Sequence, residues 1–419
     1  MNWQEADSNG KRIWSVLRRT GRCLLAASLL AVTGCAKQEA AAEEPVQEAE
    51  PAAVNEETIG MWFSYLEYQN LCAGMDEAAF TEFAAEAVSN MKSVGVNNLY
   101  LHAVAFTDAL YDSAVYPASA YKPGAYDPFR IFSDAAHAEG IKVHAWINPM
   151  RSVAAEDAQN LPEDFVIREW IDRNDERVRQ NGDRYYLNPA YPEVRSLICS
   201  VVNELLETYH PDGIHLDDYF YPYGTEKNFD AYIYSRALEE NESLTLEDFR
   251  MNNTDRMVQD IHDTVKRFDP AVQFGISPAG NIDNCITLLY ANPYHWVEQG
   301  TVDYLIPQIY WGYLHPIKPF EPTFEEWKQV TEGSDVRLMV GLAAYVIGLK
   351  LNLSEDETVN REWADNDDMM ARQMATVFSG GGDGVAYFSY SSLFAPDAGT
   401  TEIVENEIIH IKNYLDSRG

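Results

Sequence analysis

Basic side chains are scarce in this sequence. Its 419 residues include 31 Lys and Arg against 66 Asp and Glu, which gives a formal net charge of -35 at pH 7. A chain this acidic repels nucleic acid and anionic surfaces, so we exclude nucleic acid as a partner. Hydrophobic residues make up 46% of the chain and aromatic residues 12%. This composition excludes a disordered or fibrous protein and predicts a globular protein with a large core.

Cysteine is also rare, with five in the whole chain. Cys23 falls in an N-terminal apolar stretch, and Cys199 shares an apolar helical face with its neighbours. Cys72 and Cys285 fall in expected loops, so a bridge between these two stays open. Because no even-numbered set of closely spaced cysteines is present, disulfides are not expected to hold the fold together.

The N-terminal apolar stretch is short. It covers residues 23–32, follows five basic residues, and is not long enough to span a bilayer as a stable anchor. The small residues before Cys35 are typical of a bacterial lipobox, in which this cysteine is lipidated and becomes the first mature residue. An ordinary cleaved signal is the alternative. We therefore expect an exported protein that is held at the membrane through a lipid on Cys35 and faces the cell envelope or the outside.

The domain boundaries follow from composition. Residues 1–34 are predicted to be the lipoprotein signal peptide. Residues 35–57 are rich in Ala, Glu, Gln and Pro and contain no aromatic residue, which predicts a disordered acidic linker. Residues 58–419 are predicted to form the folded domain.

Short apolar runs alternate with longer amphipathic segments from residue 58 onward. This order predicts eight strand–helix units and an α/β fold, a (β/α)8 TIM barrel with insertions. A doubly wound sheet is the alternative, but no Gly-rich phosphate loop follows the first strand. The expected strands are 59–63, 97–103, 141–147, 212–217, 272–277, 302–310, 336–342 and 384–389. The expected helices are 76–93, 128–139, 192–209, 245–268, 292–299, 323–332, 366–379 and 400–416.

The connections differ in length at the two ends of these units. Helix-to-strand connections are short, whereas the strand-to-helix connections 148–191 and 218–244 are long. In barrel enzymes the strand-to-helix loops build the active face. We therefore expect a deep, loop-walled site at the carboxyl ends of the strands.

Polar and apolar residues alternate on several expected strands. On the fourth strand Ile214 and Leu216 alternate with His215 and Asp217, and successive side chains point to opposite faces. The polar residues are therefore predicted to face the barrel interior, where they are costly unless they serve a ligand. A buried hydrogen-bond network is the alternative. The same parity directs Tyr100, His102, His144, Trp146, Asn148, Gln308 and Tyr310 inward.

Asp217 is the acidic residue that this parity places inside the barrel at the end of a strand. An inward carboxylate among aromatic side chains suits glycoside hydrolysis, because it attacks or stabilises the cationic sugar of the transition state. We expect His102, His144 and His215 to donate hydrogen bonds that keep Asp217 ionised as nucleophile or charge stabiliser. A metal held by these three histidines is a less favoured alternative. No metal or cofactor motif is present in the sequence, so no cofactor is expected.

The second carboxylate that glycosidases use is harder to identify. Asp218 is the first candidate for the acid, because adjacent carboxylates push their pKa values apart. Asp283, after the fifth strand, is the second candidate, and Asp108 is a third. Substrate contacts are expected from polar and aromatic residues at the strand ends, among which Arg151 could hold a carboxylate or lactyl group. These residues are His102, His144, Asn148, Arg151, Asn188, His215, Tyr219, Tyr221, Asn281, Gln308, Tyr310, Trp311 and Tyr345.

An ordered set of motifs carries a resemblance to a known family. The motifs are HAWINPMR, YYLNPAYPEVR, DGIHLDDYFYP, ISPAGN and PQIYWG. Together they resemble the bacterial glycosyl-hydrolase-like family 10 over nearly all of residues 58–419, and DGIHLDDYFYP is the most specific of them. That family consists of exported, often lipid-anchored barrel proteins and includes a division-site glycosidase that cleaves peptide-free peptidoglycan strands.

The resemblance implies a glycoside hydrolase with a bacterial cell-wall glycan as substrate. Two other functions stay open. A non-catalytic glycan-binding lipoprotein on a degenerate barrel is one, because no obvious acid partner stands out. An α-glucan-type hydrolase is the other, because the fourth strand is similar to its counterpart in amylase-type barrels.

Overall fold

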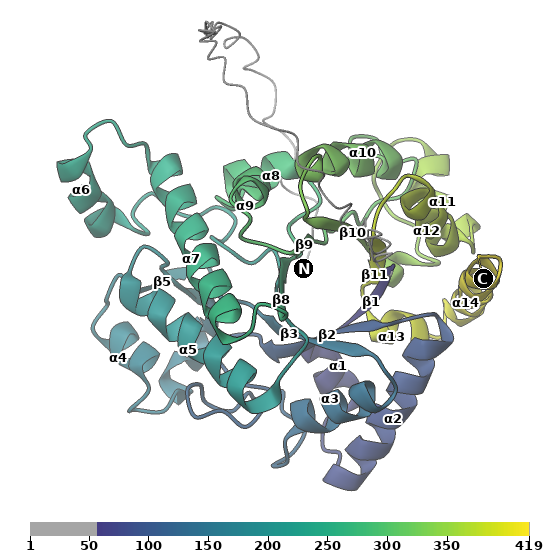
Figure 1. The fold of residues 1–419 in the computed structure, drawn as a ribbon, viewed down its shortest axis with the longest axis horizontal. Coiled ribbons are helices and arrows are strands. Elements are labelled where there is room, and N and C mark those ends of the chain that lie inside the picture. The colour runs from purple at the N-terminus through teal and green to yellow at the C-terminus, as the bar shows by residue number, and fades with distance from the viewer. Residues whose placement is uncertain (1–56, 419) are drawn as a thin grey trace, which may run out of the picture. The chain divides into compact units, whose positions relative to one another are not determined.

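The computed structural model describes residues 57–418, in which eight parallel strands close into a barrel ringed by helices (Figure 1). The predicted (β/α)8 TIM barrel is thereby confirmed. Around the barrel the order is β1, β2, β3, β7, β8, β9, β10 and β11, and β11 pairs again with β1. The strands are β1 (Thr58–Phe63), β2 (Asn98–Val104), β3 (Lys142–Ile147), β7 (Gly213–Leu216), β8 (Gln273–Ile276), β9 (Tyr304–Leu305), β10 (Arg337–Leu342) and β11 (Gly384–Tyr387).

The sixth barrel strand, β9, is much shorter than the expected 302–310. Pro307 lacks a backbone N–H and interrupts the ladder. Pairing resumes beyond it only as single bridges from Gln308 to Ala279 and to Gly341. The chain after Leu305 therefore keeps its place in the barrel without regular strand geometry, which brings the Gln308 side chain to the mouth.

The expected helices are all present, with bounds shifted by at most a few residues. Their starts follow local capping rules: the Asp76 side chain accepts a hydrogen bond from Ala79 N at 2.9 Å, and Pro192 begins its helix at a position that needs no N–H. The helices are α2 (Glu77–Ser93), α3 (Pro128–Ala138), α5 (Pro192–Tyr209), α7 (Leu246–Phe268), α9 (Pro293–Glu298), α10 (Phe320–Thr331), α12 (Met369–Ser379) and α14 (Thr401–Asp416).

The strand-to-helix loops contain further short helices that the sequence pattern did not predict. Most have fewer than ten residues, too few to show a clear 3.6-residue period. They are α1 (Tyr65–Leu71), η1 (Ala155–Asn160), α4 (Val166–Asp172), α6 (Ala231–Glu240), α8 (Ile282–Leu288), η2 (Ala344–Val346), α11 (Glu357–Asp365) and α13 (Tyr390–Phe394).

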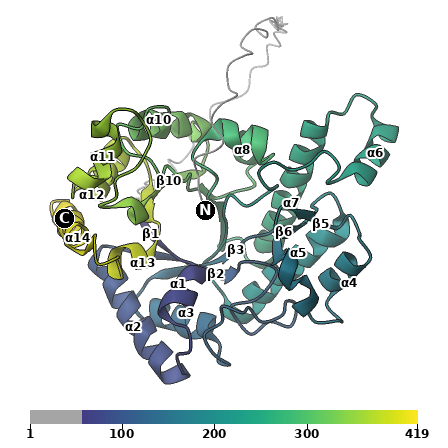
Figure 2. The ribbon, with the colours of Figure 1, turned by 180° about the vertical axis from the view of Figure 1, so that it is seen from behind.

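A second, three-stranded sheet is not predicted by the sequence pattern. It consists of β4 (Arg151–Ala154), β5 (Val178–Asn181) and β6 (Arg184–Leu187), with β6 in the centre. From either side it lies outside the barrel near α4 and α5 (Figures 1 and 2). Its strands have four residues each, are rich in polar side chains and are mostly half-buried, so no clean alternation marks them. The β5–β6 turn contains Gly182 at φ 63°, a conformation that suits glycine.

Strand parity is confirmed for the barrel. Leu99, Val143 and Ile214 belong to the large core between strands and helices. A separate apolar cluster fills the barrel interior, and it is unusually aromatic for a position where branched aliphatic residues dominate. Its members are Trp62, Tyr100, Trp146, Tyr304, Ile306, Met339 and Ala386.

The three cysteines of the described residues are free thiols. The bridge between Cys72 and Cys285 that the sequence left open is not formed, and these residues lie at the end of α1 and within α8 instead of in loops. Cys199 on α5 is half-buried. Among residues 57–418 no helix is both long and apolar enough to cross a membrane. The predicted signal peptide, the predicted lipidation site Cys35 and the predicted linker up to residue 56 lie outside the described residues.

Candidate active site

Two acidic residues, Asp217 and Asp218, follow β7 at the carboxyl end of the barrel. Both are nearly buried, with 3% and 6% of their surface exposed. Asp217 accepts hydrogen bonds from Trp146 Nε1 and from the backbone N of Tyr219, both at 3.1 Å. Asp218 Oδ1 accepts one from Gln308 Nε2 at 3.2 Å. Because β7 ends at Leu216, the two acids are free of strict strand alternation, and both reach groups at the mouth.

Burial raises the pKa of both carboxyl groups. The pKa of Asp217 lies well above its usual range, since the charge of Asp218 adds to the effect of burial and outweighs the two N–H donors and Arg151. Burial raises the pKa of Asp218 to about 6, against the opposing effects of Gln308 and Arg151. Near neutral pH we therefore expect the pair to share one proton, and the larger rise of the Asp217 pKa favours that residue as its carrier. The sequence expectation has Asp217 as the ionised partner, so which of the two acids carries the charge stays a prediction for experiment.

The three interior histidines do not contact Asp217, so the expectation that they hydrogen-bond to it is wrong. His144 binds Asn98 Oδ1 and the Tyr304 hydroxyl, both at 2.9 Å. His215 binds the same hydroxyl at 3.2 Å and accepts from Trp62 Nε1 at 3.2 Å. This network lies within the aromatic cluster of the interior. It matches the buried hydrogen-bond alternative and leaves neither ring free for a sugar.

His102 is a neighbour of the acid pair through Trp146. Its ring stacks on Trp146 with centroids 3.7 Å apart, and its Nδ1 accepts from Tyr65 N at 3.3 Å. Burial lowers the pKa of His102 to about 3 and that of His144 to about 4, and it lowers the pKa of His215 well below its usual range. All three rings are therefore neutral at physiological pH. His102 orients the indole that donates to Asp217.

Cationic and aromatic side chains surround the acids. The Arg151 guanidinium lies 3.9 Å from the centroid of the Tyr219 ring. Tyr310 lies close enough for both acids to raise its pKa further, beyond the effect of burial. Its ring contacts Phe388 and Tyr345, with centroids 5.7 Å away in each case, and Tyr345 is 44% exposed. These rings offer a stacking surface for a sugar beside the acids.

Several predicted site residues have other positions or roles. Asp283 is exposed in the first turn of α8, which Asn281 caps by accepting from Asp283 N at 3.1 Å. Asn188 is fully buried and holds a turn through Glu176 O at 3.2 Å and Ala190 N at 3.1 Å. No hydrogen bond joins Asp283, Asn281 or Asn188 to the acid pair, so the structure does not bring them together with it and their roles stay predictions.

Tyr221, Asp108 and Trp311 form no hydrogen bond with the acid pair. Tyr221 is fully buried against Phe229 and Tyr290 and cannot reach a ligand. Asp108 accepts from Phe106 N at 3.0 Å in the loop after β2. Trp311 is half-buried, and its ring contacts His315 at 5.6 Å. Asn148, in contrast, is buried beside His102 as the parity predicted.

Three residues of the site were not assigned a role from the sequence. Trp146 was placed inward by parity, but nothing in the sequence shows that its indole reaches Asp217. Phe106 lies in the loop after β2, and Arg184 lies on β6. The Phe106 ring contacts both Arg151 and Arg184, although the three residues are far apart in the sequence. Among residues 57–418, no group of three or more His, Cys, Asp or Glu side chains is placed to hold a metal ion.

The stacking of a sugar on Tyr310 stays a prediction, which a single substitution can test. Tyr310→Ala is expected to weaken glycan binding by about 1–3 kcal/mol, the scale of burying a large side chain. Isothermal titration with a glycan oligomer measures the loss, and Tyr232→Ala, at a 65% exposed tyrosine on α6, is the matched control. If Tyr310→Ala and Tyr232→Ala bind glycan equally well, Tyr310 belongs to the packing of the mouth.

Comparison with known proteins identifies related sequences. The family described as Glycosyl hydrolase-like 10 matches residues 60–359. Glycosyl hydrolase DigH of Escherichia coli K12 is 32% identical over 268 residues, covering 56% of this chain and 57% of that protein. Glycosyl hydrolase YngK of Bacillus subtilis 168 is 29% identical over 287 residues, covering 62% of this chain and 55% of that protein. The chain thus matches little more than half the length of these curated relatives.

Solved structures with the same barrel are more distant in sequence. The PgaB (BpsB) glycoside hydrolase domain from Bordetella bronchiseptica superposes with a TM-score of 0.54 at 15% identity, covering 84% of this chain and 99% of that one. The catalytic domain of β-amylase from Paenibacillus polymyxa has a TM-score of 0.55 at 10% identity, covering 88% and 99%. At these identities the likeness shows the fold alone.

Proposed function

Because this chain belongs to the glycosyl hydrolase-like 10 family, we propose that it is an exported glycoside hydrolase of bacterial cell-wall glycan. Peptide-free peptidoglycan strands are the proposed substrate. The observation that carries the proposal is the buried pair Asp217 and Asp218 at the carboxyl end of the barrel, with one proton and one charge between them. Glycoside hydrolysis needs one carboxyl group in each state.

The two acids are proposed to divide the chemistry. Protonated Asp217 donates its proton to the glycosidic oxygen as the bond to the leaving group breaks. Ionised Asp218 stabilises the positive charge that develops on the sugar, or attacks its anomeric carbon. A water molecule then adds to the anomeric carbon and returns a proton to Asp217, which restores both acids. Gln308 orients Asp218, and Trp146 orients Asp217. The aromatic mouth around Tyr310 supplies binding for the flanking rings.

The proposal is tested with purified peptide-free glycan strands. The described domain is expected to release soluble fragments from them, measured by mass spectrometry and by new reducing ends. Peptide-bearing peptidoglycan and a starch-like α-glucan are the comparison substrates. Turnover of the α-glucan alone would replace the proposed substrate by the α-glucan alternative.

Activity should depend on pH through the acid pair. Below about pH 6 Asp218 becomes protonated and loses its charge, so kcat/KM should fall with an acid limb near that value. At higher pH Asp217 loses its proton, and kcat/KM should fall again. The profile is measured between pH 4 and 10, with Tm recorded at each pH to exclude unfolding. An acid limb near the ordinary pKa of an exposed aspartate would contradict the buried, coupled pair.

Membrane attachment through Cys35 is part of the proposal. Cys35→Ser is expected to move the full chain from the membrane to the soluble fraction, because the lipid would be lost while the folded domain is untouched. Fractionation of cells that express either the wild-type chain or the variant measures the shift. Cys199→Ser is the matched control. Equal membrane retention of the two variants would exclude a lipid on Cys35 as the sole anchor.

A second candidate function is glycan binding without catalysis. The observation in its favour is that the two acids expose only 3% and 6% of their surface. Binding of glycan strands with no release of fragments by the wild-type protein would select this function.

A further inference from the structure

Two arginines of the added sheet form no ion pair within the described part of the chain, and one of them, Arg151, lies within electrostatic range of the acid pair. Arg151 on β4 pairs with Tyr186 of β6 in the antiparallel register, and Arg184 lies two residues before Tyr186. Cross-strand partners share a face of a sheet, and so do residues two apart. In the same sheet Arg179 pairs with Glu176 at 3.6 Å, whereas neither Arg151 nor Arg184 has an ion-pair partner among residues 57–418.

One aromatic ring holds both guanidinium groups in place. Their central carbons lie 4.7 Å (Arg151) and 4.1 Å (Arg184) from the centroid of the Phe106 ring. Arg184 Nη1 also donates to Ser152 O at 2.6 Å. A guanidinium that stacks on a ring keeps its N–H edge for other partners. The two side chains are therefore oriented, while most of their donors stay available.

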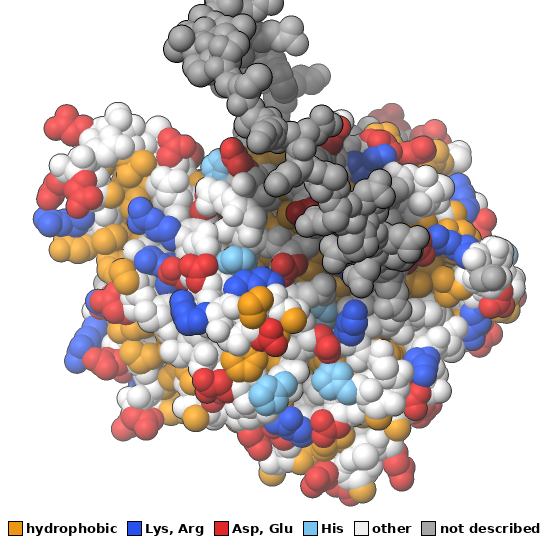
Figure 3. Space-filling model, viewed as in Figure 1, with side chains coloured by type: hydrophobic (Ala, Val, Ile, Leu, Met, Phe, Trp, Pro, Cys, Tyr) orange, Lys and Arg blue, Asp and Glu red, His pale blue; other side chains and the backbone are white. Residues whose placement is uncertain are grey.

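The local charge is unusual for this protein. Acidic side chains are spread over the face seen in Figure 3, and the chain has a net charge of -35. Yet the charge of Arg151 acts with burial to lower the pKa of Arg184. Asp108 and Asp183 lie within electrostatic range of Arg184, but neither forms an ion pair with it. Two like charges on one ring repel each other, and an anion between them would relieve this cost.

We propose that Arg151 and Arg184 form an anion subsite that binds the carboxylate of an acidic sugar residue next to the bond that is cleaved. A planar carboxylate matches the fork of a guanidinium. The Arg151 guanidinium stacks on the ring of Tyr219, the residue that follows the acid pair in the sequence. The carboxylate can come from a lactyl ether or from a uronic acid. The inference rests on the proposed function and adds a reason for selectivity, because an amide-linked peptide removes the charge that the subsite binds.

Binding, not turnover, provides the test. Titration calorimetry on the Asp218→Asn protein, which is expected to bind without turnover, compares four probes. These are a disaccharide of N-acetylglucosamine and N-acetylmuramic acid, its carboxyl-reduced alcohol, its amide, and a disaccharide that contains glucuronic acid. We expect the free carboxylate to bind about tenfold or more tightly than the alcohol or the amide, with an advantage that shrinks as salt rises. Tighter binding of the glucuronic acid disaccharide than of the muramic one would identify a uronic acid as the source.

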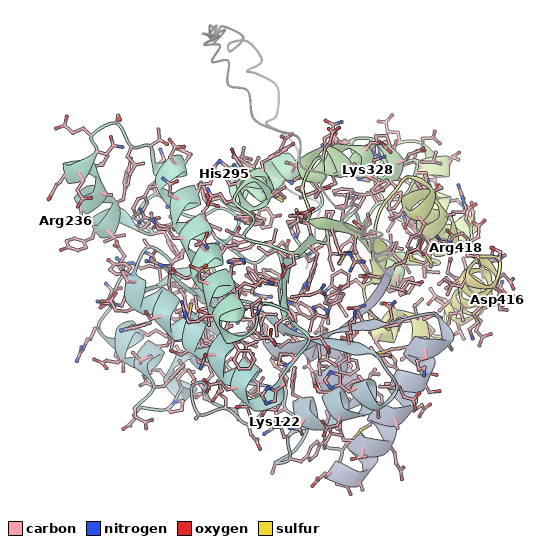
Figure 4. All side chains as sticks on the ribbon, viewed as in Figure 1. Lys122, Arg236, His295, Lys328, Asp416 and Arg418 are labelled. Carbon is pink, nitrogen blue, oxygen red and sulfur yellow. The ribbon has the colours of Figure 1, made fainter. Side chains whose placement is uncertain are left out.

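Arginine variants identify the residues. In the same background Arg184→Gln is expected to weaken binding of the carboxylate much more than binding of the alcohol, and Arg184→Lys to restore part of the preference. Arg236→Gln removes the same charge from exposed α6, far from the barrel in Figure 4, and should change nothing. If Arg184→Gln does not fold, the comparison of probes on the parent protein still decides.

Equal binding of carboxylate and alcohol, or equal weakening of both by Arg184→Gln, would overturn the subsite. The two proposals fail differently. Selective binding with no hydrolysis by the wild-type protein would remove the proposed function and keep the subsite, whereas hydrolysis without selectivity would do the reverse.

Discussion

Replacing Asp218 by Asn is expected to reduce glycan hydrolysis by about a thousandfold or more, the scale of losing a group that stabilises charge in a transition state. Asn is nearly isosteric with Asp, and its amide can still accept a hydrogen bond from Gln308 through its oxygen. The protein should therefore fold and bind glycan normally, so the loss should appear in kcat and not in KM. Steady-state kinetics on peptide-free strands, with Tm and glycan affinity measured in parallel, checks this.

Asp217→Asn is the informative companion. If Asp217 is the general acid, its replacement should lower the rate on natural glycan by about 10²–10⁴-fold. The loss should be much smaller on an aryl glycoside, whose leaving group needs no proton. Asp218→Asn should be slow on both substrates. Asp283→Asn, at an exposed position in α8, is the matched control and should behave as wild type. If the aryl glycoside restores turnover to Asp218→Asn and not to Asp217→Asn, the two roles are exchanged. Near-normal turnover by both variants would remove the pair from catalysis.

Replacing Arg250 by Met is expected to lower the free energy of unfolding by about 3–5 kcal/mol, because it leaves a buried carboxylate without its partner. The side chains of Arg250 and Asp230 are 1% and 0% exposed, and Arg250 Nη2 lies 2.8 Å from Asp230 Oδ1. Arg250 also donates to Glu226 O at 2.6 Å and to the Tyr290 hydroxyl at 3.1 Å. The pair thus ties down the long loop that follows the catalytic acids, and the variant should lose activity as well as stability.

Urea unfolding measures the loss of stability. A double variant, Arg250→Met with Asp230→Leu, should recover much of it, since an apolar replacement of both partners leaves no buried charge. The control is Arg361→Met, which breaks an exposed pair with Asp365 on α11 and should have little effect. A destabilisation by Arg250→Met no larger than that control would show that the pair does not hold the loop.

The alternation of polar and apolar residues determined the barrel and its interior. Most barrel strands are recognisable from local pattern, because one face must pack on helices and the other must fill the interior. The same rule placed Asp217 at the mouth and His102 and Asn148 inside. It failed at β9, where Pro307 ends regular pairing, and in the short polar strands β4 to β6, where half-burial leaves no pattern.

Only the tertiary structure decided which groups meet. Parity shows that a side chain points inward, but not at what depth or which neighbour it finds there. Hence His144 and His215 hydrogen-bond to the Tyr304 hydroxyl, and His215 also accepts from Trp62. The indole of Trp146 donates to Asp217 instead. The protonation of the acids depends on burial and on their mutual field, which are properties of the packed molecule. The convergence of Arg151 and Arg184 on Phe106 likewise joins three segments that are distant in sequence, and no local pattern encodes such a contact.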